Sequence, residues 1–208
     1  MNSLFVTFEG GEGAGKTSLM DQIEKDLIAK RLPVLRVREP GGTWLGEKVR
    51  SILLDQAHAI APLAELALFL ASRAQHLFDI ILPALKEGKI VLCDRYHDST
   101  IAYQGAARGL GEEKVAAACD LFCDHRWPDL TFYLDIDPKI GLERASKVRE
   151  KDRIEQEAIA FHETIRKSYL KCARADTKRI CVIDASLPPE QVFTHARALL
   201  DQRLHHVR

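Results

Sequence analysis

Short runs of apolar, β-favouring residues alternate along the chain with longer stretches in which apolar residues recur at helical spacing. The runs that predict buried strands cover residues 4–8, 34–37, 89–94, 130–134 and 180–183. The helical patterns cover residues 19–31, 44–54, 62–87, 99–107, 112–123, a segment around 140, 154–169 and 188–204. Strands that alternate with helices predict an α/β fold, a three-layer sandwich around a five-stranded parallel sheet with right-handed crossovers. We expect one domain over residues 1–208.

The loop between the first strand and the first helix has a spacing that points to phosphate binding. Residues 10–17 fit the pattern G-x-x-x-x-G-K-[ST], and both the strand before them and the helix after them are predicted. This arrangement points backbone N–H groups and a helix N-terminus at an anion, which favours a phosphate loop (P-loop) over a chance glycine-rich turn. Lys16 is expected to reach the β- and γ-phosphates of a nucleoside triphosphate, and the Thr17 hydroxyl to bind Mg²⁺. The predicted nucleotide-binding residues are Gly10, Gly11, Glu12, Gly13, Ala14, Gly15, Lys16, Thr17 and Ser18.

A carboxylate stands at the C-terminal end of the third predicted strand. In parallel α/β sheets, ligands bind outside this end of the strands, so Asp94 is the candidate for a second group near Mg²⁺. Its neighbour Arg95 adds a cation at the same edge. The alternative is an aspartate that only caps the following helix. Asp135 and Asp137, after the fourth strand, are expected to be turn and helix-capping residues.

Overall composition narrows the classes of function. Lys and Arg together number 30, as do Asp and Glu, so the chain lacks the basic excess of a duplex DNA binder and we predict no nucleic-acid partner. The longest apolar stretch, residues 52–70, is interrupted by charged residues and a proline, so we predict no membrane span. No signal-peptide pattern opens the chain, and the five cysteines form no C-x-x-C pair. We therefore expect free thiols and a cytoplasmic protein.

A P-loop alone does not separate a kinase from a switch GTPase or a mechanical ATPase. The chain lacks the N-K-x-D and D-x-x-G motifs of switch GTPases. It has instead a second set of residue types suited to phosphate and to a base, away from the P-loop: Arg50, Phe69, Arg73, Arg95 and Gln104. Two phosphate sites that face one another would suit a kinase whose acceptor is itself phosphorylated.

Four segments together resemble the bacterial thymidylate kinases, a family of P-loop nucleoside monophosphate kinases. They are Phe8 to Thr17, Arg38-Glu39-Pro40-Gly41-Gly42-Thr43, Asp94-Arg95-Tyr96 continuing to Tyr103-Gln104-Gly105, and Asp152-Arg153-Ile154-Glu155. The resemblance runs from Phe5 to about Leu199. It implies transfer of the γ-phosphoryl group of MgATP to dTMP, giving dTDP, by a homodimeric enzyme.

The resemblance implies roles for the residues that face the base. Phe69 would stack on the thymine ring, and Arg73, one helical turn on, would donate to thymine O4. Gln104 and Thr100 would address the N3 edge. Buried polar groups matched to one base reject another because the mismatch leaves them unpaired.

The same resemblance implies roles around the acceptor phosphate and sugar. Arg50 and Arg95 would hold the monophosphate, where a planar guanidinium suits phosphate oxygens. Glu12 would meet the 3′-hydroxyl, and Tyr103 would crowd the 2′ position against ribonucleotides.

A cluster of cations at residues 144–153 has two interpretations. It is either a solvated helix face or a mobile lid that brings cations onto the transferring phosphoryl group. One type of thymidylate kinase carries its catalytic arginine in the P-loop, where this chain has Gly13, so it resembles the lid type. We predict Arg149 as the catalytic residue, with Arg144 and Lys147 as alternatives, because Ser146-Lys147-Val148 departs from the commonest lid pattern.

Two other functions stay open at this level. One is a kinase for another nucleoside monophosphate or for a deoxynucleoside. The other is a nucleotide-binding regulatory protein without catalysis. A panel of acceptors separates the other kinases from a dTMP kinase, and acceptor-dependent release of ADP separates the regulatory protein.

Overall fold

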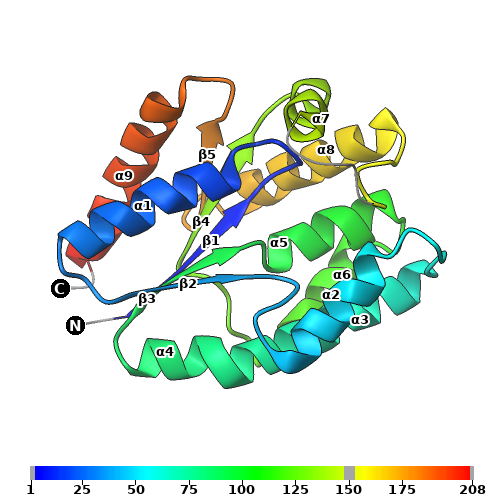
Figure 1. Ribbon diagram of the computed structural model, residues 1–208, viewed down its shortest axis with the longest axis horizontal. Helices are drawn as coiled ribbons and strands as arrows, with labels where there is room; N and C mark the ends of the chain where they lie inside the picture. Colours follow the sequence, from blue (N-terminus) through cyan, green and yellow to red (C-terminus); the bar gives the residue numbers. More distant parts are fainter. Residues whose placement is uncertain (1–2, 148–152, 207–208) are drawn as a thin grey trace.

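A sheet of five parallel strands forms the centre of the computed structural model, which describes residues 3–147 and 153–206 (Figure 1). The strands are β1 (Leu4–Glu9), β2 (Val34–Arg38), β3 (Ile90–Asp94), β4 (Leu130–Asp135) and β5 (Ile180–Asp184). Their order is β2-β3-β1-β4-β5, and every pairing is parallel. Phe8 is in register with Asp94, so the P-loop after β1 and the carboxylate at the end of β3 lie side by side. The predicted sheet is confirmed.

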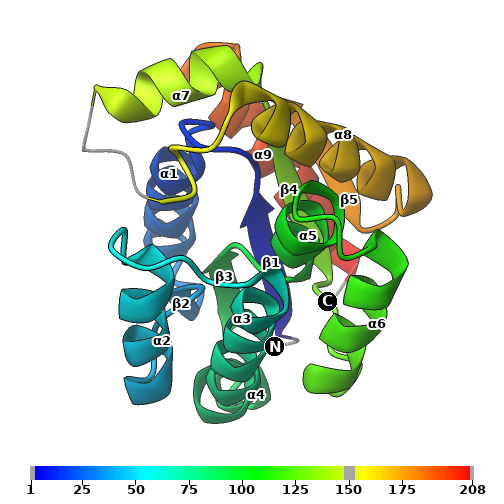
Figure 2. The same cartoon turned by 90° about the vertical axis from the view of Figure 1, so that its right-hand side faces the viewer.

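Helices cover both faces of the sheet, as the sequence predicted. The helical elements are α1 (Lys16–Ala29), α2 (Trp44–Leu54), α3 (Pro62–His76), η1 (Leu77–Ile81), α4 (Leu82–Lys86), α5 (His97–Thr100), η2 (Ile101–Ala107), α6 (Glu112–Phe122), α7 (Pro138–Ser146), α8 (Ile159–Ala175) and α9 (Pro189–His206). Leu4, Val6 and Phe8 of β1 pack with buried side chains of α1 and α9 on one face. Phe5 packs with η1 and α4 on the other face. On the same face, η2 and α8 pack against β4 (Figures 1 and 2).

Residues 62–86 form one continuous helical segment that widens in its middle. The sequence predicted a single long helix here, but the turn at Leu77–Ile81 is π-helical and is followed by Pro83. Proline has no N–H for the ladder and its ring crowds the preceding turn, and a wide turn accommodates both effects. The segment has the length of a membrane span, and the mean hydropathy of its apolar window is 1.2. One such helix is weak evidence for a membrane span, because core helices of soluble proteins have the same length and hydropathy.

Some sequence expectations about element boundaries and burial need correction. The pattern placed Ile154 in a long helix, whereas α8 begins at Ile159 and residues 153–157 form turns. Arg153 is tied there to the Leu53 carbonyl and to Glu65, which holds the chain away from helical geometry. The helical spacing of apolar residues in 44–54 predicts Ile52 on the buried side of α2, but Ile52 is half exposed. The last helix begins at Pro189, one residue later than predicted.

Local signals are confirmed for the caps Thr43 and Asp137 and for the cysteines, whereas Asp135 is the last residue of β4 and pairs with Arg166 instead of forming a turn or a cap. Thr43 accepts a hydrogen bond from the Gly46 N–H at the start of α2, and Asp137 caps α7 through the Lys139 N–H. All five cysteines are free, and Cys93 is fully buried.

Candidate active site

A cavity of about 980 Å³ opens at the carboxyl edge of the sheet. Figure 2 shows α7 across the top of the fold, above the end of β1, with α2 and α3 below. The structure places nearly every predicted site residue around this cavity. The cavity is lined by Glu12, Gly13, Ala14, Gly15, Lys16, Thr17, Ser18, Arg50, Phe69, Arg73, Asp94, Arg95, Thr100, Tyr103 and Gln104.

The P-loop wraps around the side chain of Lys16. Its Nζ donates to the carbonyl oxygens of Gly10 and Gly11, both at 3.0 Å, so these two glycines contact the site through their backbone. Burial, together with the nearby Arg95, lowers the pKa of Lys16. A poorly solvated ammonium group at a helix N-terminus favours an anionic ligand. Thr17 is exposed to the cavity on the first turn of α1.

Gly13 has no room for a side chain. Its φ of 66° lies in the left-handed region, and a Cβ there would overlap the carbonyl oxygen of Gly141 in α7. A Cβ on Gly141 would in turn overlap the Glu12 carbonyl, so the P-loop and α7 pack backbone to backbone. An arginine at position 13 is therefore incompatible with this packing.

Asp94 has the features of a metal ligand. Its Oδ1 is buried and has no hydrogen-bond partner among the described residues, which is costly for a carboxylate oxygen. Asp94 lies close enough to Lys16 to act on its charge. The following helix, α5, begins at His97, and its N-cap residue is Tyr96 with no side-chain cap, so the capping alternative for Asp94 is wrong. An unpaired carboxylate oxygen beside the P-loop fits the oxygen-ligand preference of Mg²⁺.

Arg95 links the P-loop to the acceptor side. Its Nη2 pairs with Glu12 Oε1, its Nη1 donates to the Gly10 carbonyl at 3.0 Å, and its guanidinium stands 5.0 Å from the ring centre of Tyr103. The Tyr103 hydroxyl donates to the same Glu12 oxygen at 3.1 Å. Arg95 also has a φ of 68°. Left-handed backbone at an arginine costs free energy and tends to occur at functional sites.

Behind Arg95 lies a carboxylate that the sequence did not single out for a role. Glu9 is fully buried and accepts hydrogen bonds from the Tyr96 N–H, the Ser99 hydroxyl and the Tyr169 hydroxyl. Burial, with the charge of Asp98, raises its pKa to about 7. The only sequence signal was its place directly before the glycine loop.

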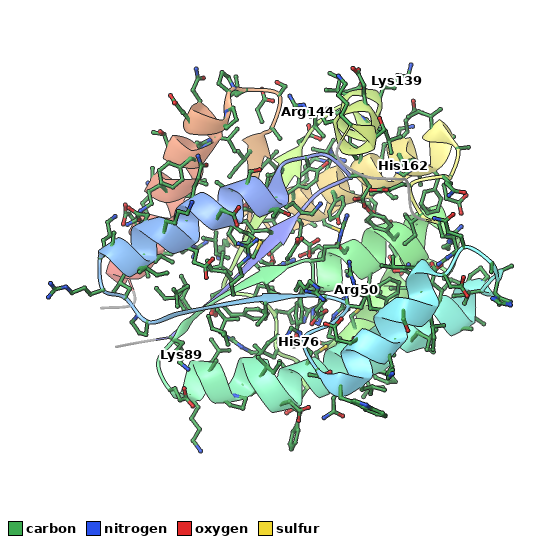
Figure 3. The ribbon with its side chains drawn as sticks, in the orientation of Figure 1. Arg50, His76, Lys89, Lys139, Arg144 and His162 are labelled. Atoms are coloured by element: carbon green, nitrogen blue, oxygen red, sulfur yellow. The ribbon has the colours of Figure 1, made fainter. Side chains whose placement is uncertain are left out.

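Arg73, the arginine predicted to contact the base, is fixed by hydrogen bonds to buried groups. Arg73 is 1% exposed, and its Nε donates to Glu39 Oε2 at 2.6 Å. His76, labelled in Figure 3, contacts Glu39 Oε1 at 3.0 Å, and the Tyr96 carbonyl accepts from Arg73 Nη2. Phe69 is half-buried one turn before Arg73, on the cavity wall. Glu39 lies in the Arg-Glu-Pro segment, but nothing in its spacing indicated an arginine 34 residues away.

A cluster of potential ligand atoms lies beside this arginine. Glu39, His76 and Cys93 place ligand atoms within 4.8 Å of one another. Glu39 already accepts from Arg73 and contacts His76, and burial raises the pKa of the Cys93 thiol well above its usual value. A protonated thiol and an engaged carboxylate favour a hydrogen-bonded cluster over a metal centre.

Gln104 and Thr100 lie on the cavity wall beyond Arg73, and both are buried. The Gln104 amide donates to the buried carboxylate of Glu65 at 2.8 Å. In the sequence Glu65 is only one of the charged residues that interrupt an apolar stretch, so its contact with Gln104 was not predicted.

The predicted lid is described only in part. Arg144 at the end of α7 lines the cavity and donates to the Ala185 carbonyl at 3.0 Å, while Arg50 approaches from α2 and donates to the Pro40 carbonyl (Figure 3). Lys147 is exposed and pairs with Glu143. Arg149 lies outside the described residues.

Known proteins resemble this chain over almost its whole length. A sequence model of the family described as thymidylate kinase matches residues 8–196. Thymidylate kinases of Protochlamydia amoebophila and of a Geobacillus species are 46% and 47% identical to it, covering 96% and 97% of this chain and 92% and 98% of their own. The crystal structure of thymidylate kinase from Ehrlichia chaffeensis superposes with a TM-score of 0.77 at 32% identity, over 96% of this chain and 99% of that one. Sequence, fold and the arrangement of the cavity agree, and the chain belongs to the thymidylate kinase family.

Proposed function

We propose that this protein transfers the γ-phosphoryl group of MgATP to dTMP, forming dTDP and ADP. In this reaction an oxygen of the acceptor monophosphate attacks the γ-phosphorus, and the bond to the β–γ bridging oxygen breaks. The observation that carries the proposal is one cavity lined both by the P-loop and by a second group of arginines, Arg50, Arg73 and Arg95, beside the aromatic and polar side chains of Phe69, Tyr103 and Gln104. Such a cavity suits two phosphorylated ligands held end to end.

The donor side uses the P-loop and the end of β3. Lys16 is already buried among P-loop carbonyls and would exchange those contacts for phosphate oxygens. The Thr17 hydroxyl and Asp94 would hold Mg²⁺. When bound, Mg²⁺ neutralises charge on the β- and γ-phosphate oxygens.

The acceptor side would use the residues implied by the family. Arg50 and Arg95 would hold the monophosphate, and Arg95 would then share its guanidinium between the phosphate and Glu12. Glu12 would accept a hydrogen bond from the 3′-hydroxyl. Tyr103, which donates a hydrogen bond to Glu12, would occupy the space of a 2′-hydroxyl.

The base would lie between α3 and η2. Phe69 would stack on its ring, Arg73 would donate to O4, and Gln104 with Thr100 would contact the N3 edge. Since these side chains are buried or half-buried and several are pinned by neighbours, the base-binding site is preorganised.

The transition-state cation would come from the lid at residues 144–153. The contact between Gly13 and Gly141 leaves no place for a P-loop arginine, which supports this assignment. Arg149 is our first choice and Arg144, which already lines the cavity, is the alternative. The adenine would lie near Ala185, Leu187 and Val192, which line the same cavity.

We propose a homodimer in the cytoplasm. Exposed large apolar side chains occur on the elements from α2 to α6, where a second copy would cover them. They are Trp44, Ile52, Leu63, Phe78, Leu82, Leu121 and Phe122. Five free thiols suit a reducing compartment.

A coupled assay of ADP release tests the proposed reaction. The purified protein is given MgATP alone and then with dTMP, dCMP, dGMP, AMP or thymidine. We expect release of ADP only with an acceptor, and far faster with dTMP than with the others. Faster turnover with another monophosphate or with thymidine would assign a different kinase, and slow hydrolysis indifferent to dTMP would point to a regulatory nucleotide-binding protein.

A further inference from the structure

Glu65 of α3 receives hydrogen bonds from three residues in two segments of the chain. Its side chain is 1% exposed. Gln104 Nε2 of η2 donates to Oε1 at 2.8 Å, and Arg108 Nε donates to the same oxygen at 3.2 Å. Arg153, the last residue of the predicted lid, donates to Oε2. A buried carboxylate with this many donors is ionised, because two guanidinium groups and an amide favour its charged form.

The ionisation of Glu65 follows from these contacts. Burial alone would raise its pKa, but the hydrogen bonds from Gln104 and Arg153 and the charge of Arg108 outweigh burial, and its pKa lies below the ordinary value. An ionised carboxylate only accepts hydrogen bonds. Whatever lies against Oε1 must therefore present a donor.

This requirement fixes the orientation of the Gln104 side chain. A glutamine amide has a donor end and an acceptor end, and turning it over would set its carbonyl against the Glu65 carboxylate. The NH₂ group must face Glu65, which leaves the amide carbonyl as the end available to a ligand in the cavity that Gln104 lines. The orientation thus rests on the chemistry of the pair as well as on the observed 2.8 Å contact.

Such a fixed carbonyl distinguishes two kinds of pyrimidine. Thymine and uracil carry a hydrogen on N3 and donate there, whereas N3 of cytosine is an acceptor. If the amide of Gln104 cannot turn over, its carbonyl accepts a hydrogen bond from N3–H of thymine or uracil. With cytosine the same carbonyl faces N3, which is also an acceptor, and no hydrogen bond forms.

We propose that Glu65 is a positioning residue that sets the preference of the acceptor site for bases with an N3 hydrogen, by locking the amide of Gln104 with its carbonyl toward the ligand. This inference rests on the proposed function, because it takes the acceptor to be a pyrimidine monophosphate. Glu65 itself touches no substrate and acts through Gln104. Arg153, the last residue of the predicted lid, donates to the same carboxylate, so Gln104 and the C-terminal end of the lid share one support.

Substitution of Glu65 by glutamine tests the proposal. A neutral amide at 65 can accept or donate, so Gln104 is free to turn its NH₂ toward the cavity. We expect the ratio of kcat/KM for dTMP over dCMP to fall by about tenfold, within the range of single hydrogen-bond discriminations. The ratio for dTMP over dUMP should stay constant, since both bases carry the N3 hydrogen. A purely structural loosening of the site would lower all three activities together.

Two further variants make the test specific. In the double variant E65Q/Q104E, the amide at 65 donates to one carboxylate oxygen at 104 and the other oxygen faces the cavity, so the dTMP over dCMP ratio should recover. The matched control is Arg108→Met, which removes another partner of Glu65 but leaves its contact with Gln104, and should leave the ratio unchanged.

The outcomes separate this inference from the proposed function. A wild-type protein that does not phosphorylate dTMP overturns the proposed function and this inference with it. An active wild type, with a folded E65Q variant whose dTMP over dCMP ratio is unchanged, overturns only the role of Glu65. The role of Glu65 is also overturned if Arg108→Met lowers the dTMP over dCMP ratio as much as E65Q does. Calorimetric binding of dTMP and dCMP to each variant gives a second readout that does not depend on turnover.

Discussion

Replacing Glu9 by glutamine is expected to change how the stability of this protein depends on pH. Glu9 is fully buried behind Arg95, and its pKa rises to about 7 through burial and the charge of Asp98. In the unfolded chain the same carboxyl ionises near its ordinary value of 4.5. Between these two values the folded protein retains a proton that the unfolded chain has lost. By linkage, the free energy of unfolding must then fall as the pH rises through this interval.

The size of the effect follows from the two pKa values. A rise from 4.5 to about 7 corresponds to about 3 kcal/mol of stability, present in acid and lost by about pH 8. Glutamine is nearly isosteric and can still accept from the Tyr96 N–H, while its NH₂ group can donate to the Ser99 and Tyr169 hydroxyls. The variant removes the titration but keeps most of the local hydrogen bonding, so the difference between the two proteins isolates the Glu9 carboxyl.

Urea unfolding at fixed ionic strength, from about pH 4.5 to about pH 8, measures this difference. The free energy of unfolding of the wild type minus that of E9Q should decrease by about 3 kcal/mol across the range. In Ser99→Ala the decrease should move to higher pH, because the hydrogen bond from Ser99 favours the ionised form. A difference that is constant with pH, or that grows as the pH rises, would refute the reasoning.

Three other substitutions test the proposed site. Lys16→Ala should lower kcat by roughly 10²–10³-fold without unfolding the protein, because a positive charge beside the transferring group is lost, and near-normal turnover would reject its role. Arg73→Ala should raise the KM for dTMP and weaken the preference for thymine over cytosine by about 1–3 kcal/mol. It should also lower stability in a melting experiment, since Glu39 then stays buried without its arginine, and unchanged discrimination would mean that Arg73 does not read the base. Arg149→Ala should reduce kcat by roughly 10²–10³-fold with little change in the KM for dTMP; a silent result with a damaging Arg144→Ala would move the role to Arg144.

Local chemistry made much of this protein readable from its sequence. Strands and helices alternate with distinct apolar periods, and a glycine loop between a strand and a helix has few structural solutions. The position of Asp94 followed from the rule that parallel sheets bind ligands at their carboxyl edge, and the structure sets it beside the P-loop. Capping residues such as Thr43 were also predictable, because a cap acts within one turn of its own helix.

Features that depend on packing between distant segments could not be predicted from the sequence. The supports of the base-reading residues are contacts across 34 and 39 positions, Arg73 with Glu39 and Gln104 with Glu65, and no periodicity encodes such pairs. The late start of α8 has the same cause, because Arg153 is held by a residue 88 positions earlier.

The sequence by itself therefore determined the α/β architecture, the nucleotide loop and the residue types available at the site, since each depends on neighbours along the chain. Only the tertiary structure decided which carboxylates lie behind those residues, that Gly13 has no space beside Gly141, and that burial and Asp98 raise the pKa of Glu9. The physical reason is that desolvation and close packing depend on what surrounds a group in three dimensions, and the surroundings of a buried side chain come mostly from remote parts of the chain.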